Sequence, residues 1–150
     1  MWFPYLSADR TERWGSADAT QAEVPLVLVE KAQGALRIAA MNPIAAQAAL
    51  RPGMALAEAR ALLTRLRVEE MDRAADHALL LELATACERF TPLVALRDGD
   101  GLLLDITGCT HLFGGEGALM GQARRVLRRL GVSSRAALAG TPDAAWAFAR

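Results

Sequence analysis

Two short apolar runs, residues 93–96 and 102–106, lie on either side of Asp98-Gly99, and this arrangement constrains the fold more than any other part of the chain. Asp and Gly tolerate the positive φ of a tight hairpin turn, so the two runs are predicted to form antiparallel strands. One apolar stripe at helical spacing precedes the hairpin between residues 79 and 90, and another follows it between residues 119 and 130. The centre of the chain is therefore predicted to be helix, hairpin, helix.

The flanking segments add further strands and helices. Predicted strands are residues 2–6, 25–30, 35–41, 67–71 and 135–139, and predicted helices begin at Asn42-Pro43, at residue 54 and at Pro142. With residues 23–71 set aside as an insertion, the order is strand, helix, strand, strand, helix, strand. The predicted fold class is α+β, with a ferredoxin-like β-α-β-β-α-β domain interrupted by a small insertion.

The charge of the chain is balanced, with 17 basic and 17 acidic residues. A zero net charge argues against a protein that neutralises nucleic-acid phosphates over its whole surface. The helix predicted at residues 116–130 is a local exception, because one side of it carries Arg124, Arg125, Arg128 and Arg129. These arginines are candidate contacts for weak, non-specific DNA binding; the alternative is the solvated polar face of an amphipathic helix.

Potential metal ligands and membrane segments are both sparse. The cysteines and histidines (Cys87, Cys109, His77 and His111) are scattered without the spacing of a zinc site. No run approaches the roughly 20 apolar residues of a membrane span, and charged residues from Asp9 onward interrupt the N-terminus before any signal-like run. We expect no metal site, no membrane segment, and a soluble cytoplasmic protein.

Three stretches resemble one family in order and spacing. Residues 51–59 are similar to the fingers segment, residues 102–107 to a palm strand, and Gly140-Thr141-Pro142 to a helix entry of the Y-family translesion DNA polymerases. The run 105–115, DITGCTHLFGG, is the most specific signal. Together with residues 2–6, WFPYL, and 25–30, PLVLVE, it resembles a branch of that family, the pseudo-polymerase subunit of the bacterial mutasome.

The resemblance implies a domain organisation. Residues 1–22 and 72–150 would form the polymerase palm, and residues 23–71 the small fingers insertion. The thumb and little-finger domains of the family have no counterpart within these 150 residues.

The resemblance also implies where a polymerase site would lie. The family's three catalytic carboxylates fall on Pro4, Asp100 and Gly101, so only one is retained. Two residues that hold the incoming triphosphate fall on Pro43 and Ala46, whose side chains cannot bond a phosphate. Asp100 also has a simple explanation as part of a tight turn. No intact catalytic or nucleotide-binding set is expected, and no cofactor.

The function implied is a non-catalytic subunit that acts as an adaptor in damage-induced, error-prone translesion synthesis and DNA repair. Its expected partners are a RecA-like companion protein, an error-prone C-family replicative polymerase and the sliding clamp, partly through regions outside these residues. Two alternatives stay open. One is an active Y-family polymerase with an atypical magnesium site, and the other is a ferredoxin-like domain of unassigned role.

Overall fold

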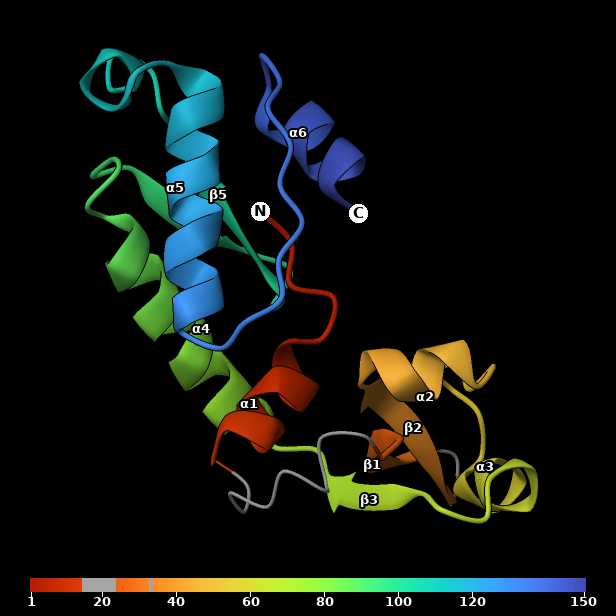
Figure 1. The fold of residues 1–150 in the computed structure, drawn as a ribbon. Coiled ribbons are helices and arrows are strands. Elements are labelled where there is room, and N and C mark those ends of the chain that lie inside the picture. Colours follow the sequence, from red (N-terminus) through yellow and green to blue (C-terminus); the bar gives the residue numbers. More distant parts are fainter. Residues whose placement is uncertain (15–23, 33) are drawn as a thin grey trace. The chain divides into compact units, whose positions relative to one another are not determined.

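The computed structural model describes residues 1–14, 24–32 and 34–150 (Figure 1). Its helices and strands, in chain order, are α1 Leu6–Trp14, β1 Leu26–Ala32, β2 Ala35–Met41, α2 Pro43–Gln47, α3 Leu56–Leu62, β3 Arg67–Glu70, α4 Arg73–Cys87, β4 Val94–Arg97, β5 Gly101–Leu104, the 3-10 helix η2 Thr110–Phe113, α5 Glu116–Arg129 and α6 Pro142–Ala149. In this part of the chain no helix is long and apolar enough to cross a membrane.

The chain divides into two compact units. One comprises Met1–Leu6 and Ala74–Arg150, and the other comprises Ser7–Arg73. The palm and fingers boundaries stay a prediction, and the one between residues 22 and 23 lies outside the described residues.

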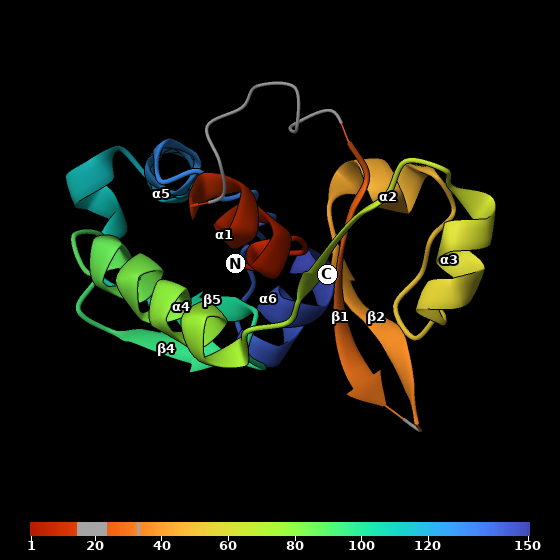
Figure 2. The same cartoon turned by 90° about the horizontal axis from the view of Figure 1, so that it is seen from below.

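The unit 7–73 is built on a three-stranded sheet in the order β2-β1-β3, in which β1 is antiparallel to β2 and parallel to β3. The predicted strands at 25–30, 35–41 and 67–71 and the helix at 54–63 are confirmed to within a few residues. Figure 2 shows α2 and α3 on one side of β1 and β2. That side carries the unit's apolar core: Val27, Val29, Ile38, Met41, Ala45, Leu50, Leu56 and Ala59.

Asn42 joins the sheet of this unit to its helices, and the helix start predicted there is confirmed. Its Oδ1 accepts hydrogen bonds from the backbone N–H of Ala45 at 2.9 Å, capping α2, and from that of Leu26 at 3.1 Å. Its amide nitrogen donates to Glu12 Oε1 at 2.9 Å and to the Val24 carbonyl at 3.1 Å. Pro43 follows at the first helical position, where its missing N–H costs nothing.

The other unit contains the predicted hairpin, which is confirmed as the antiparallel pair β4 and β5. Asp98 and Gly99 both have positive φ, 51° and 78°, within the three-residue loop between the paired residues Arg97 and Gly101. Trp2 pairs antiparallel with Gly101 on one side and with Arg135 on the other. The resulting antiparallel order, β4, β5, Trp2, Arg135, is the strand order of a ferredoxin-like sheet.

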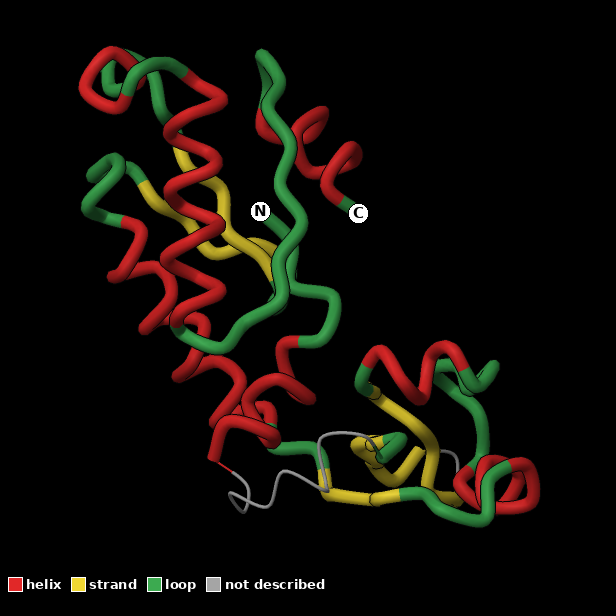
Figure 3. The backbone as a smooth tube through the Cα atoms, viewed as in Figure 1, coloured by secondary structure: helices red, strands yellow, loops and turns green. Residues whose placement is uncertain are grey.

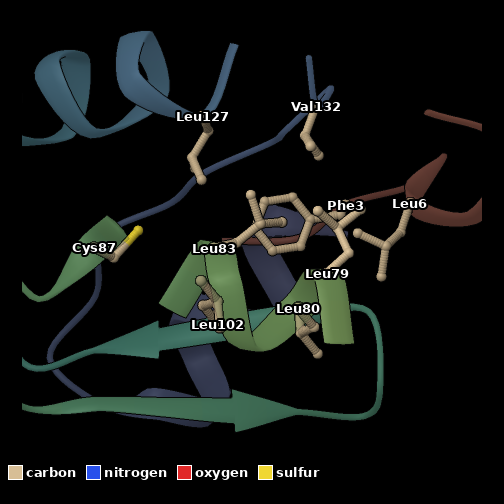
Figure 4. Close-up of a cluster of buried hydrophobic side chains, with 9 residues drawn as sticks. All are labelled: Phe3, Leu6, Leu79, Leu80, Leu83, Cys87, Leu102, Leu127 and Val132. Carbon is tan, nitrogen blue, oxygen red and sulfur yellow. The ribbon is translucent and has the colours of Figure 1, made fainter. Parts of the chain in front are cut away.

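Helices α4 and α5 cover the face of this sheet that carries Leu102. Figure 4 shows the leucines of α4 gathered with Leu102 and Phe3, and Leu127 of α5 reaching the same cluster. The cluster consists of Phe3, Leu6, Leu79, Leu80, Leu83, Cys87, Leu102, Leu127 and Val132. Burial of the Cys87 thiol raises its pKa to about 11, so it is an inert core residue.

The predicted strands at 2–6 and 135–139 are wrong except at one residue each. Trp2 and Arg135 pair with each other, but Pro4 and Tyr5 form a turn and α1 begins at Leu6. Pro4 has no backbone N–H to continue a ladder. Residues 136–139 have no partner strand in the described chain, and Figure 3 draws them as loop.

The specific run 105–115 is a compact connection between β5 and α5. The backbone N–H of Thr107 donates to Asp105 Oδ1 at 2.9 Å, which closes a short turn. Gly114 and Gly115 then take positive φ values of 85° and 103°, which glycine adopts at no steric cost. Between them and the turn, the Phe113 ring packs on the ring of Phe90 with a centroid distance of 5.4 Å. Local backbone geometry therefore accounts for much of this run.

Candidate functional site around Asp100

The backbone of Asp100 is held on two sides. Its N–H donates to the Arg97 carbonyl at 3.3 Å, which closes the hairpin turn, and its carbonyl accepts from the Phe3 N–H at 2.9 Å. The carboxylate thus stands at the junction of the hairpin with the N-terminal segment. This is where the resemblance places a metal-binding carboxylate.

The side chain that meets Asp100 is Trp2, whose indole Nε1 donates to Asp100 Oδ2 at 2.9 Å. The other carboxylate oxygen, Oδ1, is buried without a hydrogen-bond partner among the described atoms. The sequence analysis placed the family's first carboxylate position at Pro4 and did not single out Trp2, which is the side chain that reaches Asp100. Pro4 lies in the turn that follows Phe3, because Trp2 is the one residue of the strand predicted at 2–6 that pairs with other segments.

Gly101 lies directly beneath the ring of Trp146. A Cβ at position 101 would fall under 3.0 Å from Cζ3 and Cη2 of that ring and 2.8 Å from the Met1 carbonyl oxygen, distances that real Cβ atoms essentially never show. Trp146 itself is only 6% exposed. No side chain, and so no carboxylate, fits at position 101 in this structure.

Three arginines surround the two indoles. Arg97 lies 6.0 Å from the centroid of the Trp146 ring, Arg135 lies 5.5 Å from that of Trp2, and Arg150 contacts both rings at 5.6 and 5.7 Å. Cation–π contacts of this kind stabilise by about 0.5–1 kcal/mol at exposed sites. Arg97 also forms an ion pair with Asp143 of α6 at 3.0 Å, so the arginines bind α6 to the sheet.

The donor set around Asp100 does not fit a magnesium site. Magnesium in nucleotide-processing enzymes takes oxygen ligands, usually one or two carboxylates with phosphates and water. The neighbours of Asp100 are an indole, a glycine and a second indole. In the described ranges no three Asp, Glu, His or Cys side chains gather closely enough to hold a metal ion.

The other positions marked from the sequence carry no polar side chain. Pro43 is the first residue of α2 and Ala46 lies exposed in the same helix, both in the unit 7–73.

The four arginines of α5 form an exposed basic face. Arg124, Arg125, Arg128 and Arg129 are all exposed, while Leu119, Ala123 and Leu127 of the same helix are buried. None of the four guanidinium groups has an ion pair or a hydrogen bond within residues 1–14, 24–32 and 34–150. They are therefore available to an anionic ligand.

Comparison with known proteins agrees with this fold. The chain superimposes on the insertion ternary complex of Dbh DNA polymerase with a TM-score of 0.85 and 16% identity, covering 99% of this chain and 44% of that one. For DinB from Sulfolobus solfataricus the TM-score is 0.77, with 14% identity and coverage of 99% and 43%. At such identities the likeness shows the fold alone, which is the palm-like α+β fold of Y-family DNA polymerases.

Sequence similarity goes further. Residues 16–150 match the impB/mucB/samB family, and the chain belongs to that family. It is 50% identical over 99 residues to Protein ImuB of Caulobacter vibrioides, in both the NA1000 / CB15N and the CB 15 strains. Those 99 residues are 66% of this chain and 22% of ImuB, so the chain spans about a fifth of that relative. Family membership removes the alternative of a ferredoxin-like domain without assignment.

Proposed function

We propose that this chain forms the palm and fingers of a non-catalytic Y-family polymerase-like subunit, which acts as an adaptor in damage-induced, error-prone translesion synthesis. The observation that carries the proposal is the setting of Asp100. Of the three positions at which the resemblance places the family's catalytic carboxylates, only residue 100 is an acid. Its side chain is hydrogen-bonded to Trp2, and the neighbouring Gly101 is covered by the ring of Trp146.

The chemistry of nucleotide transfer explains why this setting matters. Two divalent ions about 3.5–4 Å apart stabilise the attacking and leaving oxygens, and converging carboxylates must hold them. A single carboxylate with an indole donor on one oxygen cannot hold such a pair. The polymerase fold would then serve to present surfaces for binding instead of a reaction centre.

The adaptor role is proposed from the resemblance and from the surface of α5. We propose that the full-length protein acts in the cytoplasm with a RecA-like companion, an error-prone C-family polymerase and the sliding clamp. The exposed arginines of α5 would add weak, sequence-independent contacts to DNA phosphates.

Primer extension by the full-length protein tests the proposal. Wild-type and Asp100→Ala proteins, matched in concentration, are incubated with primed DNA, the four dNTPs and either Mg²⁺ or Mn²⁺. We expect no extension by either protein. Extension by the wild type that Asp100→Ala removes would establish the alternative, an active polymerase with an atypical metal site.

A further inference from the structure

We infer that Trp2 and Trp146 together close the metal position of the palm, so that restoring the missing carboxylate at residue 101 could not by itself reopen it. The inference deepens the proposed function, and rests on it for the assignment of Asp100 and Gly101 to family metal positions. The packing of Trp146 on Gly101 does not depend on that assignment.

Trp146 belongs to α6, and contacts at the start of this helix hold its ring over Gly101. Thr141 caps α6 through a hydrogen bond from the Ala144 N–H to its Oγ1 at 3.3 Å, and Pro142 occupies the first turn. The Arg97–Asp143 ion pair at 3.0 Å then ties the helix to β4. A buried ring fixed in this way cannot move aside cheaply for a new side chain.

Trp2 is fixed equally firmly. Its backbone N–H donates to the Arg135 carbonyl and its carbonyl accepts from the Arg135 N–H, both at 2.8 Å. Its indole N–H donates a hydrogen bond to one carboxylate oxygen of Asp100, and the Arg135 guanidinium lies over its ring. The space next to the carboxylate is therefore filled by an indole whose position is set by the sheet.

The two tryptophans have separate effects. Trp2 donates a hydrogen bond to one oxygen of Asp100, and its indole occupies the space beside that oxygen. Trp146 excludes any Cβ at position 101, whatever the side chain. Gly101 is not at a positive φ, so the close approaches of the Trp146 ring and, less severely, of the Met1 carbonyl oxygen are the reason why only glycine fits there.

A double-mutant cycle tests the claim for Trp146. The melting temperature is measured for wild type, Gly101→Ala, Trp146→Ala and the double variant. We expect Gly101→Ala to lower the melting temperature sharply in the wild-type background and much less in the Trp146→Ala background, where the 2.8 Å approach of the new Cβ to the Met1 carbonyl oxygen remains. If Gly101→Ala alone does not fold, a folded double variant supports the same conclusion.

Gly117→Ala is the matched control, because Gly117 is in α5 and a Cβ there meets nothing within 4 Å. It should raise the melting temperature slightly in both backgrounds. Equal shifts from Gly101→Ala with and without Trp146 would overturn the inference. They would leave the adaptor role untouched, whereas primer extension by the wild type would overturn the role and leave the cycle intact.

Manganese binding, followed by electron paramagnetic resonance, tests both tryptophans. Residue 2 is given a carboxylate because Trp2 is the side chain that reaches Asp100. Trp2→Asp/Gly101→Glu/Trp146→Ala, shown by circular dichroism to be folded, should bind Mn²⁺, and the further change Asp100→Asn should abolish that binding. Gly101→Glu alone should not bind it. Binding by a folded Gly101→Glu protein, or no binding by the folded triple variant, would contradict the inference.

Discussion

Asp100 and Asp105 lie five positions apart, one at each end of β5, and their carboxylates are used differently. Asp105 is exposed, and its Oδ1 accepts a hydrogen bond from the Thr107 backbone at 2.9 Å. Hydrogen bonds from the side chain and backbone of Thr107 hold the pKa of Asp105 below its usual value. Asp105 therefore closes a turn, whereas Asp100 joins Trp2 to the hairpin.

The lowered pKa of Asp105 predicts how one residue affects stability with pH. A carboxyl whose folded-state pKa is depressed contributes stability that is present above the unfolded pKa and lost as pH falls through the folded pKa. The difference in unfolding free energy between wild type and Asp105→Ala should thus be largest near neutral pH and shrink in acid. Urea denaturation of both proteins across this range measures it, and a difference that grows in acid would contradict the assignment.

Asn42 carries a prediction for the helix–sheet junction of the unit 7–73. Asn42→Ala removes the cap of α2 and leaves the buried N–H of Leu26 without its acceptor. A lost N-cap costs about 0.5–2 kcal/mol and an unsatisfied buried donor about 1–3 kcal/mol. We expect a total loss of about 2–4 kcal/mol in unfolding free energy, measured by chemical denaturation. Gln47→Ala, at the end of the same helix, should change stability by less than about 0.5 kcal/mol.

Helix α5 carries a prediction for DNA. Arg124→Ala, Arg125→Ala, Arg128→Ala and Arg129→Ala combined should weaken binding to duplexes of any sequence, because binding to phosphate is the mode that exposed arginines offer. The slope of log K against log salt should become shallower by up to ~0.9 for each arginine that no longer neutralises a phosphate. Fluorescence anisotropy over a salt series measures both quantities.

The control for this experiment removes the same number of positive charges elsewhere. Lys31, Arg51, Arg60 and Arg65 are exposed in the unit 7–73. Changing all four to alanine should affect DNA binding less than the α5 variant does. Equal losses of affinity from the two sets would show that net charge, not the α5 face, governs the interaction.

The turns and helix starts that the sequence predicted correctly are those specified by a short pattern of adjacent residues. Asp98-Gly99 and Asn42-Pro43 specify a turn and a helix start within a few residues, and both appear in the structure. The pairing of Trp2 with Arg135 and the packing of Trp146 on Gly101 join segments far apart in the chain. No sequence periodicity encodes such long-range contacts. The positions of Trp2 and Trp146 beside Asp100 could therefore not be predicted, although Asp100 itself was identified from the sequence.

At the scale of the whole molecule, the 150 residues hold two compact units with separate cores. Each core has its own sheet and its own covering helices, as expected for a polymerase palm with an insertion. None of the clusters of buried apolar side chains described above or around Phe90 includes Asp100, so the packing of these cores does not depend on its carboxylate. The cellular effect of changing Asp100 therefore tests the proposed non-catalytic role with little interference from a loss of core packing.

In an active polymerase, removal of a metal-binding aspartate should nearly abolish synthesis. Here Asp100→Ala in the full-length protein removes one hydrogen bond from Trp2 and a buried oxygen that has no partner among the described atoms, so its cost should be about 1 kcal/mol. We therefore expect damage-induced mutagenesis close to wild type, scored at matched protein levels. Leu83→Ala, a core truncation costing about 2–5 kcal/mol, shows how far reduced abundance alone lowers the readout. A normally abundant Asp100→Ala protein without induced mutagenesis would mean that the carboxylate still takes part in chemistry.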